Sequence, residues 1–325
     1  MQRLGFYEVL GKLGEGGMGT VYRARDRRTD DVVAVKLLSP ELRGSLGARK
    51  RFLREGVVGQ RLVHPRIVAV REVGEVHLPN MDRTLFLAME LVPGRDLHHR
   101  LSFEELDLPS TVELGAQIAE GLAAAHSAGV VHRDLKPGNV LVSSEGAVKL
   151  LDFGLAQVAD EDEKGLELEE VAPGATQQGV VIGSLGYAAP EQIASSRVDP
   201  RADLFSLGVV LHQLLTGRLP FAGTSHYDIL AAMEKVRRRI AEPPRPSSAC
   251  PWVPPSLDDL VVSLLALDPQ QRPASAAEVA TALRRILESE AETLRLPPPA
   301  PEGPSSAREG RLRRLMRRAR DLLGG

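Results

Sequence analysis

Apolar and polar positions follow two different periods along this chain, and the period changes near residues 90–94. Before that point, apolar residues form short alternating or continuous runs that glycine or charged turns separate, as in β-strands. The runs predict strands at 6–13, 20–26, 31–38, 67–74 and 84–91, with a single helix at 46–62.

Beyond residue 93 the apolar positions recur with the period of an α-helix. One face of 111–128 is apolar and consists of Val112, Leu114, Ile118, Leu122 and Ala125. Similar stretches predict helices at 202–216, 225–238, 256–267 and 275–287. A small β-rich part therefore precedes a larger helical part, which indicates the α+β class.

Composition narrows the type of protein without identifying it. Of the 325 residues, 43% are hydrophobic and 26% are charged, and the net charge is −2. These values exclude a mostly disordered or collagen-like chain, and the charge balance indicates no nucleic-acid partner. Cys250 is the only cysteine, which fits a reducing compartment. Because neither a signal peptide nor an 18-residue apolar stretch is evident, the sequence predicts a cytoplasmic protein.

A glycine-rich motif, GEGGMG at residues 14–19, lies between two predicted strands. Without Cβ atoms, glycines let the backbone approach phosphate groups and donate N–H hydrogen bonds to them. The motif alone is weak evidence for a phosphate-binding site, since a glycine-rich hairpin turn explains it equally well. A strand follows it, whereas a helix would follow it in a dinucleotide-binding site.

Lys36 lies within the apolar third strand, where burial without a partner would be costly. A phosphate group and a carboxylate would both stabilise it, and Glu55 in the following helix is the candidate carboxylate. The alternative is an edge-strand lysine that reaches solvent, with Glu55 on a solvated helix face.

The most specific motif is HRDLKPGN at residues 132–139. Asp134 can accept a proton or orient a hydroxyl group, Lys136 can neutralise a transferring phosphoryl group, and Asn139 offers a neutral oxygen to Mg²⁺. Asp152 opens the tripeptide DFG directly after a strand-like run, and its carboxylate also suits Mg²⁺.

Together these motifs resemble those of the protein kinase family, in order and in spacing, over about residues 5–290. The resemblance implies a bilobal protein kinase fold with a small β-rich N-lobe, about 1–90, and a larger helical C-lobe, about 94–292. It implies transfer of the γ-phosphoryl group of ATP to Ser or Thr hydroxyls of proteins, with Mg²⁺, or alternatively Mn²⁺, as cofactor. The GMG of the glycine-rich loop and Lys136 are similar to the bacterial Ser/Thr kinases.

The resemblance also implies roles for single residues. Asp134 is the catalytic base with Lys136 beside it, Lys36 holds the phosphates and pairs with Glu55, and the metal ligands are Asn139 and Asp152. The implied ATP site comprises Lys36 together with Leu13, Gly14, Glu15, Gly16, Gly17, Met18, Gly19, Val21, Ala34, Met89, Glu90, Val92 and Leu141. Of these, Val21, Ala34 and Leu141 would enclose adenine. Met89 would lie before the hinge residues Glu90 and Val92, which would bind adenine through their backbone.

Further landmarks surround the activation segment, which ends in APE at residues 189–191. Asp203 matches the aspartate that braces the catalytic loop, and Arg272 matches the arginine that pairs with the glutamate of APE. Within the segment, Thr176 is the predicted main autophosphorylation site. Ser184, which stands where the family usually has threonine, is a second candidate phosphosite.

Two alternatives remain beside an active Ser/Thr protein kinase. A pseudokinase would bind nucleotide as a scaffold, but Lys36, Asp134, Asn139 and Asp152 are all intact. A small-molecule phosphotransferase would not need Lys136 or the complete segment, which builds a peptide-binding surface in the family.

Two charged segments stand apart from the motifs. The acidic segment, residues 160–170, has seven acidic residues against one lysine, and a solvated loop is its simplest interpretation. The basic tail, residues 308–325, has seven arginines against two acidic residues around an apolar helical face. It predicts binding to an anionic membrane or an acidic partner, with a short solvated helix as the alternative. The predicted kinase domain is 1–292, and a Pro-rich linker, 293–307, precedes the tail.

Overall fold

The computed structural model describes residues 3–77, 83–104, 106–153, 157–158, 186–194, 198–221, 223 and 225–295. Two compact units divide the chain, Met1–Leu287 and Glu288–Gly325, and the second is described only as far as Arg295. Thr176, Ser184, the acidic segment and the basic tail lie outside the described residues.

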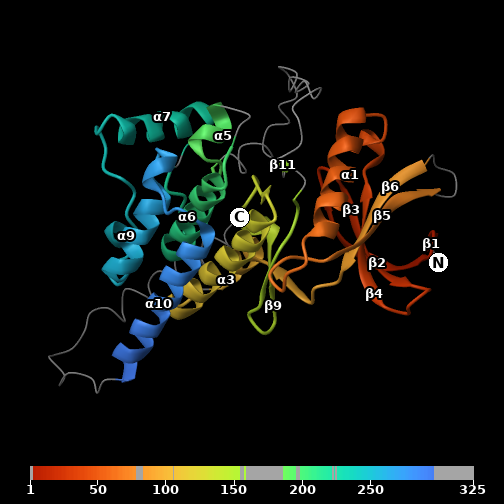
Figure 1. Cartoon of the computed structure of the whole chain (residues 1–325), viewed down its shortest axis with the longest axis horizontal. Helices are drawn as coiled ribbons and strands as arrows, with labels where there is room; N and C mark the ends of the chain where they lie inside the picture. The colour runs from red at the N-terminus through yellow and green to blue at the C-terminus, as the bar shows by residue number, and fades with distance from the viewer. Residues whose placement is uncertain are drawn as a thin grey trace, which may run out of the picture. The chain divides into compact units, whose positions relative to one another are not determined.

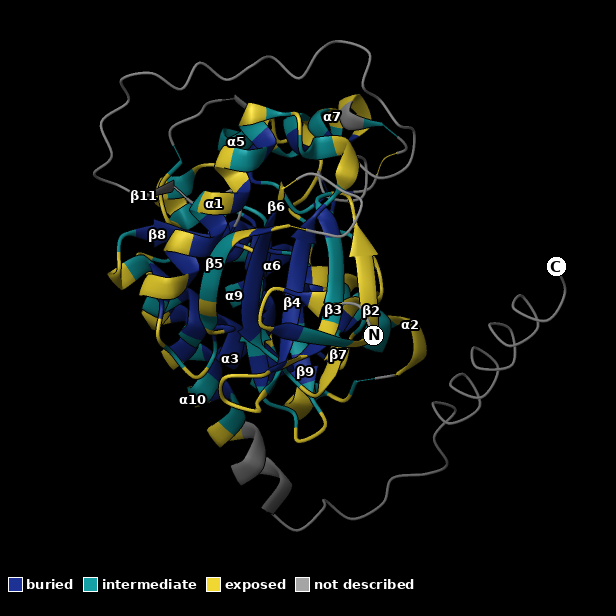
Figure 2. Cartoon of the chain, turned by 90° about the vertical axis from the view of Figure 1, so that its right-hand side faces the viewer, coloured by how far each residue is buried: buried dark blue, intermediate teal, exposed yellow. Residues whose placement is uncertain are grey.

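The amino-terminal lobe is a six-stranded antiparallel sheet in the order β1-β2-β3-β4-β6-β5, with one helix beside it (Figure 1). Its elements are β1 (Arg3–Leu4), β2 (Tyr7–Gly16), β3 (Gly19–Asp26), β4 (Val32–Leu38), a 3₁₀ turn (Pro40–Leu42), α1 (Leu46–Arg61), β5 (Val70–His77) and β6 (Arg83–Glu90). Strand β4 is buried along nearly its whole length (Figure 2), which explains why its sequence is continuously apolar rather than alternating.

The carboxy-terminal lobe is mainly helical and confirms the predicted α+β segregation. Its elements are β7 (Gly94–Asp96), α2 (Leu97–Phe103), α3 (Leu108–Ser127), β8 (Val130–Val131), a 3₁₀ turn (Pro137–Asn139), β9 (Val140–Ser143), β10 (Val148–Leu150), β11 (Gln157–Val158), α5 (Pro190–Ala194), α6 (Arg201–Thr216), α7 (His226–Arg237), α8 (Pro246–Ala249), α9 (Pro255–Leu264), a 3₁₀ turn (Pro269–Gln271) and α10 (Ala276–Arg295). Helix α6 is buried on nearly every side and forms the centre of this core with α3 and α9.

Several element boundaries differ from those that the apolar pattern predicts. Strand β5 begins three residues later than predicted, since residues 66–68 form backbone hydrogen bonds with Leu150 instead. Helix α3 begins earlier, at Leu108, because the Asp107 side chain accepts a hydrogen bond from Ser110 N–H and caps it. Helix α10 continues to Arg295, into the predicted linker. The short elements β1, β7, β8, β11, α2, α5 and α8 were not predicted.

Helix α1 approaches β5 and β6 unusually closely at a glycine. A Cβ atom at Gly56 would lie 2.7 Å from Val73 Cγ2, 2.8 Å from Val73 Cβ and 2.8 Å from Leu87 Cδ1. Atoms this close would overlap, so Gly56 allows α1 to pack against the sheet at this distance.

Gly56→Ala is therefore expected to destabilise the protein by about 1–3 kcal/mol through overpacking, although alanine favours a helix by about 1 kcal/mol. Denaturant unfolding monitored by circular dichroism measures the change. Gly56→Ala combined with Val73→Ala is the matched control, because it removes Val73 Cγ2, the atom that would lie nearest, and should recover part of the lost stability. If Gly56→Ala alone raises the free energy of unfolding, the close packing does not limit this position.

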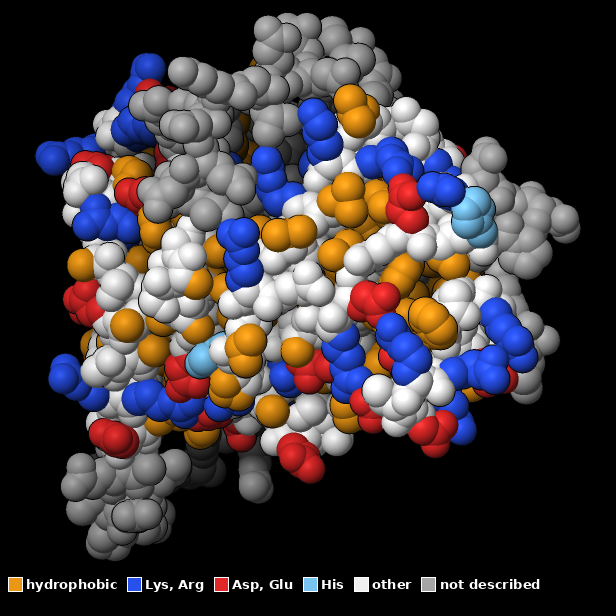
Figure 3. Space-filling model, turned by 45° about the vertical axis from the view of Figure 1, so that its right-hand side comes forward, with side chains coloured by type: hydrophobic (Ala, Val, Ile, Leu, Met, Phe, Trp, Pro, Cys, Tyr) orange, Lys and Arg blue, Asp and Glu red, His pale blue; other side chains and the backbone are white. Residues whose placement is uncertain are grey.

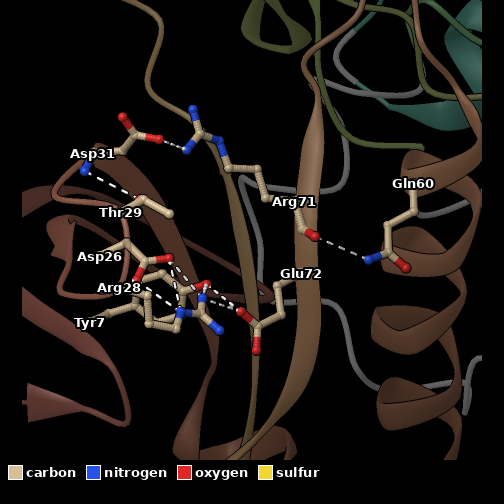
Figure 4. Close-up of polar contacts among 8 residues, drawn as sticks. All are labelled: Tyr7, Asp26, Arg28, Thr29, Asp31, Gln60, Arg71 and Glu72. Atoms are coloured by element: carbon tan, nitrogen blue, oxygen red, sulfur yellow. Dashed lines mark hydrogen bonds and ion pairs between the residues drawn. The ribbon is translucent and has the colours of Figure 1, made fainter.

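A polar network joins β2, the β3–β4 turn and β5 at one side of the sheet (Figure 4). Arg28 donates from Nη2 to Tyr7 Oη (2.8 Å), Asp26 Oδ2 (2.7 Å) and Glu72 Oε2 (2.6 Å). The Tyr7 hydroxyl also donates to Glu72 at 2.5 Å. Burial and the neighbouring Glu72 carboxylate raise the pKa of Tyr7, so it remains a hydrogen-bond donor at neutral pH. The network fixes the register of strands that are distant in sequence.

The described surface carries both signs of charge. Figure 3 shows Lys and Arg side chains interspersed with Asp and Glu side chains over one face, in keeping with the near-neutral composition. Among the described residues, the helices are all too short or too polar to cross a bilayer.

Candidate functional site

The glycine-rich motif forms the turn between β2 and β3, where Gly16 pairs with Gly19. At Gly19 a Cβ atom would lie 1.8 Å from Leu37 O, so the packing of the sheet itself requires glycine there. At Gly14, Gly16 and Gly17, by contrast, a Cβ atom would meet nothing within 4 Å. Internal packing does not explain these three glycines, and the space beside them is open to a ligand.

Lys36 is central to a cluster of charges whose other members are Glu55 and Asp152. It lies on β4 with 7% of its surface exposed, and its Nζ atom is 2.8 Å from Glu55 Oε1 and 2.9 Å from Asp152 Oδ1. Glu55, on α1, is only 4% exposed. The cluster thus joins the sheet, the helix and the start of the activation segment, which lies 116 residues after Lys36.

The three groups alter one another's pKa values. Burial tends to lower the pKa of Lys36, but the charges of Asp152 and Glu55 outweigh it and raise that pKa. Burial would raise the pKa of Asp152, yet the Lys36 ammonium keeps it below its ordinary value. Burial dominates at Glu55 and raises its pKa. At neutral pH the lysine and Asp152 are therefore both charged.

Asp134, Lys136 and Asn139 meet in the loop after β8. Lys136 Nζ lies 2.7 Å from Asp134 Oδ2, and Asn139 Nδ2 donates to the Asp134 backbone oxygen (2.7 Å) and to Oδ2 (3.0 Å). Because its amide nitrogen is committed to Asp134, Asn139 presents its amide oxygen to any ligand. The Leu151 N–H donates to the Asn139 backbone oxygen at 2.9 Å, which brings Asn139 next to Asp152.

The buried carboxylate of Asp203, on α6, braces this loop. It accepts hydrogen bonds from the backbone N–H groups of His132 and Arg133, both at 2.8 Å, and lies 2.8 Å from His126 Nε2. Arg133 and Asp152 both have positive φ angles, 67° and 57°, which strain a residue with a side chain. The hydrogen bonds to Asp203 offset the strain at Arg133.

An apolar cluster unites the residues expected around adenine. Ala34 and Met89 face each other across β4 and β6 and belong to one buried cluster. Val21, Val92 and Leu141 pack against this cluster from β3, from the chain after β6 and from β9. Leu13 is 50% exposed and is not part of it.

Sequence reasoning did not identify Lys149, which anchors the predicted hinge. Its Nζ atom is 2.6 Å from Glu90 Oε1, which also accepts a hydrogen bond from Ala69 N–H at 2.8 Å. The Glu90 N–H donates to Ala69 O at 2.9 Å, so this N–H is already committed within the protein. A lysine in the middle of a three-residue strand carries no local signal of this contact.

The remaining landmark is the predicted pairing of Arg272 with Glu191, and it is present. Arg272 is 4% exposed and forms a bidentate pair with Glu191, with N···O distances of 2.5 and 2.9 Å. It also donates to Ala266 O and Arg201 O, so one guanidinium joins the end of the activation segment to two other parts of the lobe.

Arg272→Lys is expected to destabilise the protein by about 2–4 kcal/mol, because an ammonium cannot replace the fork of donors. Thermal denaturation measures the change. A matched control is Arg238→Lys, where the pair with Glu234 is exposed and the expected change is about 0.5 kcal/mol or less. Equal effects at the two positions would contradict the structural role of Arg272.

Comparison with known proteins gives a consistent result. The family model described as "Protein kinase domain" matches residues 7–283. Serine/threonine-protein kinase pkn3 of Myxococcus xanthus is 38% identical over 287 residues, 86% of this chain and 50% of pkn3. Serine/threonine-protein kinase PknL of Mycobacterium tuberculosis is 37% identical over 313 residues, 95% of this chain and 72% of PknL.

Solved structures are similar too. The Mycobacterium tuberculosis PknI kinase domain matches with a TM-score of 0.64 at 28% identity, over 87% of this chain and 97% of that one. The chain spans half the length of pkn3 and 40% of a relative from Streptomyces coelicolor. The family match covers both lobes and every described residue of the candidate site. The chain therefore belongs to the protein kinase family, and its two lobes have the protein kinase fold.

Proposed function

We propose that this chain is an active, ATP-dependent Ser/Thr protein kinase that phosphorylates protein substrates. One observation carries the proposal: a buried lysine, Lys36, lies between the carboxylates of Glu55 and Asp152, at 2.8 and 2.9 Å. Burying a lysine ammonium costs free energy, so a buried lysine that is held between two carboxylates indicates a functional site. The relatives pkn3 and PknL are named serine/threonine-protein kinases, which supports the proposal over the pseudokinase alternative.

In this proposal Lys36 binds the phosphates of ATP, and Glu55 holds its ammonium in place. The open backbone at Gly14, Gly16 and Gly17 donates hydrogen bonds to the phosphates. The apolar cluster around Ala34 and Met89 takes the adenine ring, with backbone groups of Glu90 and Val92 at its edge. The other proposed contacts of the nucleotide are Leu13, Glu15, Met18, Gly19, Val21 and Leu141.

Phosphoryl transfer depends on Asp134 and Lys136. Asp134 Oδ2 would accept the proton of a substrate hydroxyl or orient that hydroxyl toward the phosphorus atom. Lys136, 2.7 Å from the same oxygen, neutralises negative charge on the phosphoryl group. Asn139 restrains the Asp134 side chain through its own hydrogen bond. Holding these groups in place lowers the barrier chiefly through positioning.

A divalent cation, Mg²⁺ or alternatively Mn²⁺, fits between Asn139 and Asp152. Both residues offer hard oxygen ligands, and their backbones are joined through Leu151. When bound, the cation neutralises charge on the phosphates and orients them. Asp152 would ligate it in the ionised form that Lys36 favours.

The test is phosphoryl transfer from [γ-³²P]ATP to a basic protein substrate by the purified chain, followed by phosphoamino-acid analysis. We expect phosphoserine or phosphothreonine with Mg²⁺, and no incorporation without a divalent cation. Asp152→Asn should abolish incorporation while the thermal unfolding transition stays cooperative. Incorporation that persists in a folded Asp152→Asn variant, or phosphate on tyrosine, would refute the proposal.

The roles of the residues outside the described part of the chain remain predictions from the sequence. We propose Thr176 as the main autophosphorylation site and Ser184 as a second candidate phosphosite, and phosphopeptide mapping of active enzyme tests both. For the basic tail we propose attachment of a cytoplasmic protein to an anionic membrane, with an acidic partner as the alternative. Co-sedimentation with anionic vesicles, with and without residues 308–325, distinguishes these two.

A further inference from the structure

The outward face of α1 has an apolar stripe with no described neighbour over it. Leu46, Leu53 and Val57 are spaced seven and four residues apart, so they lie on one side of the helix. They are 67%, 38% and 43% exposed. Residues on the inward side of the same helix, such as Phe52 and Val58, are buried in the protein. Helix α1 therefore has apolar residues on its inward side and on its outward side.

Basic side chains border this stripe on one side. Lys50 and Arg61 lie four residues after Leu46 and Val57, and Arg54 lies between them. None of the three forms a hydrogen bond or ion pair within the described part of the chain, whereas Arg49 on the other side of the stripe pairs with Glu75. The only acidic residue of α1, Glu55, is buried against Lys36. The face therefore presents an uncompensated positive charge beside an apolar stripe.

A segment of opposite character begins close to this face. The described chain of the activation segment starts at Asp152, whose carboxylate contacts Lys36, the partner of Glu55 on α1, and it reaches Val158 at the end of β11. The acidic segment starts two residues later and carries two leucines, Leu166 and Leu168, among its seven acidic residues. Eight residues from Val158 to Leu166 span at most about 28 Å, which exceeds the roughly 24 Å length of a 16-residue helix.

From this complementarity we propose that the outward face of α1 is a docking surface for the chain's own acidic segment. Leu166 and Leu168 cover the apolar stripe of Leu46, Leu53 and Val57, and the flanking carboxylates pair with Lys50, Arg54 and Arg61. Tethering makes the contact intramolecular and raises the effective concentration of the segment at the face. Docking there links the activation segment to the helix that positions Glu55.

Site-specific cross-linking tests the proposal in the full chain, with Cys250 replaced by serine. Cysteines in place of Val57 and Leu166 should form a disulfide within one chain under mild oxidation. Raising the ionic strength from about 0.1 M to about 1 M should reduce the cross-linked fraction about fivefold or more, because the Debye length falls from about 10 Å to about 3 Å. A cysteine at Val63, which is 90% exposed beyond the end of α1, is the control and should cross-link less.

Charge exchange separates docking from mere proximity. Lys50→Glu with Arg61→Glu should lower the cross-linked fraction, as should Glu161→Lys with Glu163→Lys, and the four changes together should restore it. Arg54 is left unchanged because it adjoins Glu55. A disulfide between chains, seen as a dimer without reductant, would overturn the intramolecular docking. So would equal cross-linking at Val57 and Val63, or no effect of salt and charge. None of these readouts uses kinase activity, so they stand apart from the test of the proposed function.

Discussion

Replacing Lys36 by methionine will lower the rate of phosphoryl transfer by about 10²–10³-fold, the effect of removing one charged stabilising group from an active site. The substitution removes both ion pairs, to Glu55 and to Asp152, together with the cation proposed to bind the phosphates. Glu55 then lacks a partner, and burial already raises its pKa, so it would take up a proton rather than remain as an isolated charge.

Steady-state kinetics with varied ATP measures the effect, and circular dichroism checks the fold. Lys235→Met, on α7, is the matched control, since it removes a lysine outside the site and should leave both kcat and KM unchanged. Wild-type turnover in folded Lys36→Met enzyme would contradict the role that we propose for this residue.

Replacing Asp203 by asparagine will have the second large effect. Asp203 is completely buried and accepts from two backbone N–H groups at 2.8 Å, so an amide group would direct its own N–H donors at other donors. We expect a loss of about 3–5 kcal/mol in the free energy of unfolding. The loop with Asp134 would shift, and a shift of about 1 Å lowers kcat about 10²-fold.

The effect on ATP binding should be small, because Lys36 and the adenine cluster do not contact Asp203. Denaturant unfolding and a separation of kcat from KM for ATP therefore test this prediction together. Asp199→Asn is the control, because this exposed aspartate accepts a hydrogen bond from Arg201 N–H that the side-chain oxygen of asparagine can also accept. A change in KM alone would contradict the proposed bracing.

The same carboxylate contributes to acid sensitivity. Burial alone would raise the pKa of Asp203, but hydrogen bonds and the charges of His126 and His132 lower it below the ordinary value of 3.8. Stability from this group is thus present above pH 3.8 and is lost as the pH falls below it toward the lower folded-state pKa. In Asp203→Asn this part of the acid transition should be absent, which unfolding measured between about pH 2 and pH 5 would detect.

The local patterns of this sequence predict much of the fold but little of its long-range pairing. Continuous apolar residues identified β4, and the helical period identified α3 and α6, because these elements are buried by their own side chains. The later start of β5 could not be read locally, since residues 66–68 bond to Leu150, more than 80 residues away. The apolar run continues from Ile67 to Val70 although its partner changes.

The residues of the candidate site show the same difference between local patterns and long-range contacts. Fixed spacing in the motifs indicated Asp134, Asn139 and Asp152, and the structure joins Asp152 to Lys36 and Asn139 to Asp134. Lys149 was missed because its importance arises only from the 2.6 Å contact with Glu90. His126 was missed likewise, since nothing near it in the sequence points to Asp203.

The contacts of β10 with residues 66–68 and with Glu90 have a consequence for synthesis on the ribosome. Lys149 and Leu150 reach back 82 residues to Ile67 and 59 residues to Glu90. A nascent chain that has emerged only as far as β7 contains every strand of the large sheet. Glu90, the last residue of β6, still lacks its partner Lys149 at that stage. Closing so long a loop is entropically slow, so this margin of the sheet becomes stable only after β10 has been synthesised. The two lobes are thus separate parts of the finished structure, but they complete their folding together.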